Sequence, residues 1–457
     1  MNILSKIIKQ KRAEVAARKT AFPLEKFRGN VAASDRDFYA ALEKRKREGV
    51  PAFILECKKA SPSQGLIREN FDPAAIADVY ANYADAISVL CDEIFFQGRY
   101  ENLPIVRSLV SVPVICKEFI IDEYQIFLAR YFGADAILLM LSVLNDDEYL
   151  RFAKLAHSLK MGVLTETDSE ETIARAKNLG AKVIGINNRN LRTLQTNIER
   201  TCELAKSVPA EAICVAESGL HTHADALKLA LFANAFLVGT SLMRQENLDR
   251  ACRQLIFGEN KVCGLTDVPA ARAALNAGAI FGGLIFAKKS PRCLNLSQAQ
   301  EIANSVPALD YVGVFQNNSV EEILDCVKNL KLFAVQLHGN EDLNFAKKLR
   351  ERLPAGTQIW RALDGNALDE NCDIPAIFDR IILDCENGGS GTSFDWKRVP
   401  AKLKNRALLA GGIGVENARS AQQIGCLGVE FNSAVEDVPA KKSPEKIKQA
   451  FQNLRKF

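Results

Sequence analysis

The sequence has little of what marks metal-binding, membrane or nucleic-acid-binding proteins. It contains four histidines, and no two of its twelve cysteines have the C-x-x-C spacing of a zinc or redox site. No apolar stretch reaches the ~18 residues that span a bilayer. Lysine and arginine are dispersed, without the basic blocks and interleaved aromatics typical of nucleic-acid binding. We expect no metal, no membrane and no nucleic-acid partner.

The cysteines do not resemble a disulfide framework. Five of them lie in or at the ends of apolar, β-branched runs, where a thiol behaves as a small hydrophobe: Cys57, Cys91, Cys116, Cys214 and Cys385. Disulfides are rare in reducing compartments. We therefore predict free thiols and a cytoplasmic protein.

The bulk composition is that of a soluble globular protein with more than one core. At 457 residues the chain exceeds what one hydrophobic core usually serves, so two domains are expected. Hydrophobic residues make up 48% and charged residues 25%, which is ordinary for such a protein. The net charge of +4 suits phosphorylated, acidic metabolites but does not select them.

Short β-branched runs alternate with amphipathic helical stretches along the whole chain. The first half has eight such runs, at residues 52–58, 86–92, 112–119, 134–140, 161–167, 182–188, 212–218 and 235–240. The second half repeats the count, at residues 259–266, 279–286, 310–316, 332–339, 357–363, 380–386, 407–413 and 427–433. Strands this apolar on both faces, alternating with helices, indicate a parallel sheet covered on both sides.

Each half is long enough for one closed (βα)8 barrel. We predict an α/β protein of two fused TIM barrels, with an open doubly wound sheet as the alternative. No Gly/Ser- or Pro-rich linker separates the halves, and we place the domains at residues 1–256 and 257–457. The basic, amphipathic residues 1–19 predict a helical extension across one end of the first barrel, with a transit peptide as the alternative.

Polar residues end five strands of the first half. Glu56 and Lys58 are two apart and share a strand face, while Lys117, Glu166, Asn187 and Glu217 close the third, fifth, sixth and seventh strands. One charge at a strand end is usually a solvated rim residue, but five such ends in one barrel favour a common site. Interleaved lysines and glutamates shift one another's pKa values, as acid–base chemistry requires.

Phosphate-binding signals follow three strands of the same half. Residues 61–65 (SPSQG) follow the first strand, Ser218-Gly219 the seventh and Gly239-Thr240 the eighth. Backbone N–H groups and hydroxyls after strands seven and eight commonly hold phosphate in these barrels. Each pair alone is a weak signal, because most such pairs are plain turns.

In order, ILECKKASPSQG, VICKEFIID, LTET, IGINNRNL, AESG and FLVGTSLM resemble the indole-3-glycerol-phosphate synthase family. The resemblance covers residues 1 to about 256, and ECKKASPS together with KEFIID is its most specific part. The family converts carboxyphenylaminodeoxyribulose phosphate to indole-3-glycerol phosphate by ring closure, decarboxylation and dehydration.

This resemblance implies roles for the strand-end residues. Lys117 would be the general acid of ring closure, while Glu166 and Lys58 would carry later proton transfers and Glu56 would be a partner base or orienting group. The residues implied at the substrate are Asn187, Arg189, Glu217 and Ser218. Those implied at the phosphate are Ser61, Gly219, Gly239 and Thr240. Residue 240 is Thr where Ser is expected, and the hydroxyl is kept.

The second half offers a different set of strand-end residues. Cys263 ends its first strand and Asp384 its sixth, although a strand cysteine is usually part of the core. A glycine-rich loop at residues 387–392 follows the sixth strand. Residues 410–412 (AGG) and 431–433 (FNS) end strands seven and eight, where barrels bind phosphate.

Together KVCGLT, FAKKSPRCLN, VQLHG, ILDCENGGSGTSFDW, LLAGGI and VEFNSAVE resemble the phosphoribosylanthranilate isomerase family, from about residue 257 onward. That family performs an Amadori rearrangement, which opens a ribose ring and moves a proton. The resemblance implies Asp384 as the acid and Cys263 as the base. Arg292 would meet the anthranilate carboxylate and His338 would line the pocket. The residues implied at the phosphate are Gly411, Gly412, Asn432 and Ser433.

The two resemblances imply successive steps of tryptophan biosynthesis in one chain, because the isomerase product is the synthase substrate. Acids and bases suffice for both steps, so no cofactor is expected. Alternatives are a pair of phosphosugar barrels like those of histidine biosynthesis, or a phosphate-binding protein in which one barrel has decayed. Two full cores favour a monomer.

Overall fold

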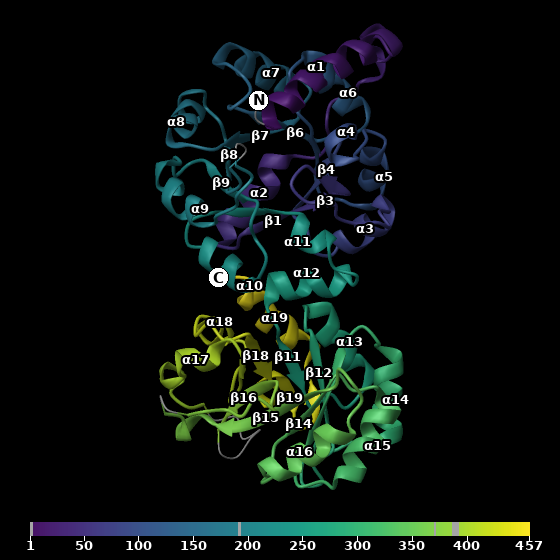
Figure 1. Ribbon diagram of the computed structural model, residues 1–457, viewed down its shortest axis with the longest axis vertical. Helices are drawn as coiled ribbons and strands as arrows, with labels where there is room; N and C mark the ends of the chain where they lie inside the picture. The colour runs from purple at the N-terminus through teal and green to yellow at the C-terminus, as the bar shows by residue number, and fades with distance from the viewer. Residues whose placement is uncertain (1–2, 191–192, 370–371, 386–392) are drawn as a thin grey trace. The chain divides into compact units, whose positions relative to one another are not determined.

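The computed structural model describes residues 3–190, 193–369, 372–385 and 393–457. The chain forms two compact units, residues 1–252 and 253–457. Figure 1 shows the first unit in purple to teal and the second in teal-green to yellow.

The first unit contains a closed barrel of eight parallel strands, adjacent in the order β1-β10-β9-β8-β7-β6-β5-β4. These strands are β1 (Ala52–Cys57), β4 (Ala86–Leu90), β5 (Val114–Lys117), β6 (Ala136–Met140), β7 (Gly162–Thr167), β8 (Val183–Asn187), β9 (Ile213–Glu217) and β10 (Ala235–Val238). A two-stranded hairpin, β2 (Ala60–Ser61) and β3 (Gly65–Leu66), follows β1.

Helices precede the first strand and separate the rest. The extension forms α1 (Ile3–Ala21) and α2 (Phe38–Glu48). The others are α3 (Pro73–Tyr80), α4 (Glu93–Phe96), α5 (Asn102–Leu109), α6 (Glu123–Tyr131), α7 (Asp146–Ser158), α8 (Glu170–Asn178), α9 (Glu199–Leu204), α10 (His223–Leu229) and α11 (Thr240–Met243). The next helix, α12 (Leu248–Phe257), begins in the first unit and ends in the second. Most begin at a polar N-cap, such as Asn145 and Ser169, whose side chains accept hydrogen bonds from backbone N–H groups of the first turn.

The second unit repeats the architecture with strands in sequential order around a closed parallel barrel. Its strands are β11 (Lys261–Cys263), β12 (Phe281–Ile285), β13 (Asp310–Phe315), β14 (Ala334–Leu337), β15 (Gln358–Asp364), β16 (Arg380–Asp384), β17 (Ala407–Leu409) and β18 (Gly428–Phe431). The hairpin β19 (Glu436–Val438) and β20 (Lys441–Lys442) follows. Its helices are α13 (Val268–Ala277), α14 (Leu296–Ser305), α15 (Val320–Leu330), α16 (Leu343–Arg352), α17 (Ala401–Lys404), α18 (Ala418–Gln422) and α19 (Pro444–Leu454).

The interior of the first barrel follows the alternation of strand faces. Ala52 and Ile54 of β1 belong to the interior cluster, and Glu56 has the same parity. Ile115 stands in the same relation to Lys117, and Leu164 to Glu166. Phe38 and Leu42 of α2 also belong to this cluster. Apolar side chains thus fill the barrel below a layer of charged ones.

Aspartates at the amino ends of two strands of the first barrel are fully paired. Asp85, just before β4, accepts bonds from the Arg45 side chain and from the backbone N–H of Phe53. Asp135, just before β6, is completely buried and pairs with Arg107 and Arg130. Burying a carboxylate is costly unless it is paired and hydrogen-bonded, so this ring of ion pairs is structural.

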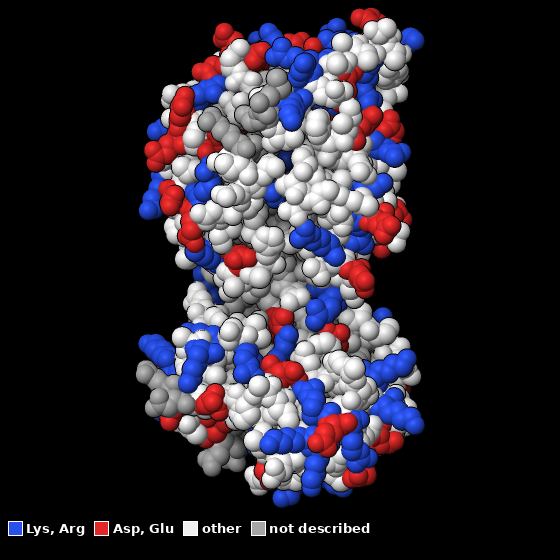
Figure 2. Space-filling view, in the orientation of Figure 1, with Lys and Arg blue, Asp and Glu red and all other residues white. Residues whose placement is uncertain are grey.

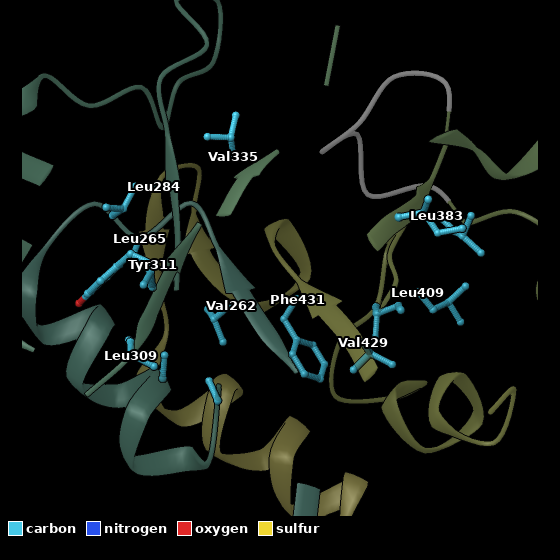
Figure 3. Close-up of a cluster of buried hydrophobic side chains, with 14 of the residues drawn as sticks. Val262, Leu265, Leu284, Leu309, Tyr311, Val335, Leu383, Leu409, Val429 and Phe431 are labelled. Atoms are coloured by element: carbon cyan, nitrogen blue, oxygen red, sulfur yellow. The ribbon is translucent and has the colours of Figure 1, made fainter. Parts of the chain in front are cut away.

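The second barrel has an inner and an outer hydrophobic layer. Ile280, Phe281, Val312 and Trp360 are fully buried in the inner layer. The larger outer layer lies between strands and helices, and Figure 3 shows Val262, Leu409 and Val429 projecting from the strand ribbons into it. Burial of such side chains is worth about 1.5–3 kcal/mol each, so these two layers supply most of the favourable free energy of folding in this barrel.

The prediction of two closed barrels with an N-terminal helical extension is confirmed, and the alternative of an open sheet is wrong. All twelve cysteines are free. Within the described ranges, no helix is both long and apolar enough to cross a bilayer. Figure 2 shows acidic and basic side chains interspersed over the visible face of each unit.

Candidate active sites

The first barrel has a pocket of about 440 Å³ at the carboxyl ends of its strands. All twelve residues predicted for this barrel line it: Glu56, Lys58, Ser61, Lys117, Glu166, Asn187, Arg189, Glu217, Ser218, Gly219, Gly239 and Thr240. They come from β1, β5, β7, β8, β9 and the segments after β1, β8, β9 and β10. Barrel closure brings together residues that lie up to 184 positions apart.

Lys117 lies between two carboxylates at the floor of this pocket. Its Nζ is 2.6 Å from Glu217 Oε2 and 3.7 Å from Glu166 Oε2. Burial acts to lower the pKa of Lys117, but the charges of Glu217, Glu166 and Glu56 outweigh it and raise the pKa. Lys117 is therefore an ammonium group at neutral pH and can donate a proton.

Glu166, unlike Lys117, has a pKa close to neutral pH. Burial and the charge of Glu217 raise its pKa to about 7, although Lys117 and the hydrogen bond from Asn187 act in the other direction. That bond joins Asn187 Nδ2 to Glu166 Oε1 over 3.0 Å. A carboxyl group with a pKa near neutrality can both hold and release a proton under working conditions.

A second ion pair lies at the end of β1. Lys58 Nζ is 2.6 Å from Glu56 Oε1. Burial acts to raise the pKa of Glu56, but Lys58 and Lys117 outweigh it and the pKa is lowered. A Cβ at Gly239 would overlap Glu56 Oε1, and one at Gly185 would overlap Glu217 Oε1. Glycine at these two positions gives the carboxylates their space.

Hydroxyl groups and glycines form one wall of the pocket. Ser61 Oγ is buried and has no hydrogen-bond partner among the described residues, so it is free to bind a ligand oxygen. Ser218 and Gly219 have positive φ values of 66° and 83°. Arg189 donates to Ser63 Oγ over 2.9 Å. This wall has the donors that a phosphate needs.

The N-terminal helix contributes residues that the sequence did not indicate. Ile3, Leu4 and Ile7 of α1 line the pocket. Lys11, 3% exposed, anchors the helix: its Nζ is 2.7 Å from Asp92 Oδ2 and 3.1 Å from Glu118 Oε1. Further lining residues that strand ends did not reveal are Phe96, Phe119, His221, Ser241 and Arg244.

In the second barrel, Cys263 lies beside a buried lysine. Lys261 Nζ is 3.3 Å from Cys263 Sγ, 2.6 Å from Gln336 Oε1 and 3.0 Å from Glu430 Oε2. Burial and the charge of Glu430 raise the pKa of Cys263 to about 12, while Lys261 acts to lower it.

Asp384 and His338 approach each other across the barrel mouth. His338 Nε2 is 4.0 Å from Asp384 Oδ2, and His338 Nδ1 is 3.0 Å from Gln336 Nε2. Burial lowers the pKa of His338, which favours the neutral ring. Cys263 is thus joined through Lys261 and Gln336 to the pair of His338 and Asp384.

Arg292 is held in a buried ion pair. Its Nε is 2.7 Å from Glu436 Oε1 and its Nη2 is 2.8 Å from Glu436 Oε2. Lys442 Nζ contacts the same Glu436 over 2.6 Å and Asn432 Oδ1 over 3.0 Å. A Cβ at Gly264 would lie 2.5 Å from Arg292 Cδ, so the arginine lies directly beside the residue that follows Cys263.

The residues predicted to hold phosphate in this barrel lie together. Gly411, Gly412, Asn432 and Ser433 line one small cavity with Asp384 and Glu430. Gly411 and Gly412 have positive φ values of 87° and 64°, which glycine adopts without strain. The glycine-rich loop at residues 387–392 lies outside the described residues.

Lys261, Gln336 and Glu430 are the polar residues that sequence reasoning missed here. They lie within runs that look like apolar core strands, so no turn or motif distinguishes them. Parity was the available signal, because Lys261 is two residues before Cys263 and Gln336 two before His338. No group of three or more potential metal ligands occurs in the part of the chain that the structure describes.

Comparison with known proteins gives two family matches. Residues 4–255 match the model of indole-3-glycerol phosphate synthase. Residues 260–453 match that of N-(5'phosphoribosyl)anthranilate (PRA) isomerase.

Curated relatives match along nearly their whole length. The chain is 50% identical to tryptophan biosynthesis protein TrpCF of Vibrio cholerae, over 100% of this chain and 96% of the relative. It is 48% identical to TrpCF of Haemophilus influenzae, over 99% of this chain and 97% of the relative. It is also 48% identical to TrpCF of Salmonella typhi, over 100% and 99% respectively.

Proposed function

The chain belongs to the indole-3-glycerol phosphate synthase family in its first half and to the PRA isomerase family in its second, and on that premise we propose how the two barrels perform their reactions. It is a bifunctional enzyme of tryptophan biosynthesis, a decarboxylating lyase and an isomerase in one polypeptide. We assign the synthase to residues 1–256 and the isomerase to residues 257–457.

In the synthase barrel, Lys117 donates the proton to the substrate carbonyl as the ring closes. Its contact with Glu217 and Glu166 supports this role, because the carboxylates keep the ammonium charged and oriented. Glu166 and Lys58 carry the later proton transfers, and Glu56 orients Lys58. Asn187, Arg189, Glu217 and Ser218 contact the substrate. Ser61, Gly219, Gly239 and Thr240 hold its phosphate.

In the isomerase barrel, Asp384 protonates the ribose ring oxygen and Cys263 removes the proton from the neighbouring carbon. The proximity of His338 to Asp384 supports a role for both at the ring oxygen. Arg292 meets the anthranilate carboxylate once substrate competes with Glu436 for its guanidinium. Gly411, Gly412, Asn432 and Ser433 hold the phosphate.

One observation carries the synthase assignment: two lysines and three carboxylates from four strands share the walls of one pocket. A non-catalytic protein would gain nothing from this arrangement, since buried charges cost several kcal/mol unless a ligand or partner compensates them. We further propose a monomeric, cytoplasmic enzyme, which light scattering and cell fractionation test.

Single-site variants of the full chain test the assignment. We expect Lys117→Ala to abolish only the synthase and Asp384→Asn only the isomerase, because each acid serves one barrel. The matched controls are Lys154→Ala and Asp325→Asn at exposed positions of the same barrels. Each variant is assayed for both reactions. Loss of both activities in either variant, with the fold intact by circular dichroism, contradicts two independent sites.

A further inference from the structure

Three buried polar side chains of the second barrel have no role in the chemistry proposed above. Lys261 of β11 and Gln336 of β14 are 0% exposed, and Glu430 of β18 is 5% exposed. They face the barrel interior and converge on the Lys261 ammonium. A fully buried lysine is costly, so its position beside Cys263 calls for a physical reason.

The hydrogen-bond inventory of Lys261 limits the role of the cysteine sulfur in the contact between them. An ammonium group has three N–H donors and no acceptor. Its three neighbours are Gln336 Oε1, Glu430 Oε2 and Cys263 Sγ, the last at 3.3 Å. Since Lys261 cannot accept a hydrogen bond, the sulfur can only be an acceptor in this contact, and a thiolate is a much better acceptor than a thiol.

Lys261 remains charged in this position. Burial acts to lower its pKa, but the charges of Cys263 and Glu430 outweigh burial and raise the pKa. Burial, the charge of Glu430 and a hydrogen bond with Glu430 raise the pKa of the Cys263 thiol, whereas the charges of Lys261 and Lys442 act to lower it. At this buried position, the balance between Lys261 and Glu430 therefore influences how readily the thiol ionises.

Gln336 connects the same lysine to the other side of the mouth. Because Lys261 can only donate, the Gln336 atom that faces it is the carbonyl oxygen, and the Gln336 amide nitrogen faces His338 Nδ1. His338 Nδ1 then accepts, so the neutral ring has its proton on Nε2, the atom that faces Asp384. Each group in this series therefore presents its N–H to the next: Lys261 to Gln336, Gln336 to His338, and His338 to Asp384.

We propose that Lys261 is a positioning residue of the isomerisation, which holds Cys263 as a hydrogen-bond acceptor so that the thiolate can act as the base, while Gln336 orients His338 toward Asp384. The proposal rests on the proposed function, in which Cys263 is that base.

Asp384 gives its proton to the ring oxygen as the C–O bond breaks and an iminium forms. Cys263 thiolate then takes the proton from the adjacent carbon, the C–H electron pair neutralises the iminium, and the sulfur ends as a thiol.

A direct titration of the thiol tests the proposal without relying on activity. The ultraviolet absorbance of thiolate is followed against pH in the full chain, and the signal of Cys263→Ser is subtracted to isolate Cys263 from the other eleven cysteines. Lys261→Met is expected to reduce the thiolate fraction of Cys263 at least tenfold at a given pH, which is a rise of one pKa unit or more. An unchanged titration overturns the proposal.

Kinetics of the same variants give a second readout. In Lys261→Met the isomerase kcat is expected to fall at least tenfold near neutral pH and to recover as the pH is raised, with KM changed less than twofold. A structural role alone would lower activity equally at every pH, and that result overturns the proposal. The control is Lys288→Met, since Lys288 is an exposed lysine of the same barrel whose side chain is 81% exposed.

Glu430→Gln keeps the proposal testable if Lys261→Met fails to fold. Removal of this carboxylate is expected to increase the thiolate fraction of Cys263, the opposite sign to the lysine variant, and an unchanged or smaller fraction overturns the proposal. Full isomerase activity in Cys263→Ser would instead overturn the proposed function and the role of Lys261 with it. If Cys263→Ser is inactive but the thiol pKa of Cys263 is unchanged in Lys261→Met, only the role of Lys261 is overturned.

Discussion

Glu166 illustrates how neighbouring charges set the chemistry of one residue. Two lysines, Lys58 and Lys117, share the mouth of the first barrel with the carboxylates of Glu56, Glu166 and Glu217. Burial and the charge of Glu217 raise the pKa of Glu166 to about 7, because Lys117 and the hydrogen bond from Asn187 offset them only in part. This residue therefore exchanges its proton most readily.

We expect Glu166→Gln to change how folding stability depends on pH. The folded-state pKa of about 7 lies above the usual value of 4.5, so between these values the folded protein binds a proton that the unfolded chain has lost. Stability of the native protein should then fall as pH rises through this window, relative to the non-titrating variant, by on the order of 2 kcal/mol.

Urea unfolding of both proteins at pH 5 and pH 8 measures this difference. The synthase kcat/KM should also lose its inflection near pH 7 in Glu166→Gln, while the isomerase profile stays the same. A stability difference that is constant between the two pH values would show that Glu166 ionises normally.

The sequence predicted which residues lie at the strand ends, but not which side chains contact them. Glu56, Lys58 and Glu217 lie at the ends of strands whose parity can be read directly from the sequence. Lys261, Gln336 and Glu430 could not be separated from core positions, because they lie inside apolar runs and their contacts join segments up to 169 residues apart. The pairing of Arg292 with Glu436 could not be predicted for the same reason, because 144 residues separate the two.

The position of helix α1 depends on one buried charge, that of Lys11. Lys11 is surrounded by Asp92, Glu118 and Glu14, and the first two are almost fully buried. Burial raises the pKa of Glu118 to about 7 even though Lys11 acts to lower it. The helix that lines the synthase pocket is thus attached to the segments after β4 and β5 by an ion cluster.

We expect Lys11→Met to destabilise the first barrel by about 3–5 kcal/mol, because it leaves buried carboxylates without their cation. Synthase KM should rise more than kcat falls, since Ile3, Leu4 and Ile7 line the pocket from the same helix. Thermal unfolding and steady-state kinetics provide the measurements. Lys19→Met, which removes an exposed pair with Asp122 from the same helix, should change stability by less than about 0.5 kcal/mol.

The strands depend on glycine at two positions in the mouth of the first barrel. Gly185→Ala is expected to lower synthase kcat at least tenfold, because its Cβ would overlap Glu217 Oε1 and move that carboxylate away from Lys117. Isomerase activity should be unaffected. The control is Gly29→Ala, where a Cβ meets nothing within 4 Å. Unchanged synthase kcat in Gly185→Ala would mean that Glu217 does not need its observed position.

Element order and type were predictable because each strand is a short apolar run and each helix a periodic one. Residues 52–58, for example, contain β1 with its six buried residues. Closure was not predictable, since it depends on contacts between the first and last strands, such as Ala52 beside Ala235. The position of α1 over the mouth depends likewise on Lys11 meeting carboxylates about 80 and 107 positions away.

In the whole molecule, Arg253 is the first residue of the second compact unit. This residue is completely buried and donates to the carbonyl oxygens of Ala279 and Ala308, both in the second unit. A fragment that starts at residue 257 lacks it, whereas one that starts at residue 248 keeps all of α12.

We expect fragment 248–457 to unfold at a higher temperature than fragment 257–457, with a difference in free energy of at least about 2 kcal/mol from lost hydrogen bonds and apolar packing. Differential scanning calorimetry measures both. Arg253→Met in the longer fragment separates the arginine from the rest of the helix. Equal midpoints for the two fragments would place α12 outside the cooperative unit of the second barrel.

The paired aspartates at the amino ends of the first barrel have a consequence for how such a protein can diverge. Asp85 and Asp135 are already satisfied by arginines and backbone N–H groups, and they lie at the end of the strands opposite the substrate pocket. A change there is expected to alter how much folded enzyme a cell accumulates while turnover per molecule stays the same, whereas a change at the pocket end, such as Lys11→Met, alters both. Natural selection can therefore adjust abundance through the amino ends of the strands without altering specificity.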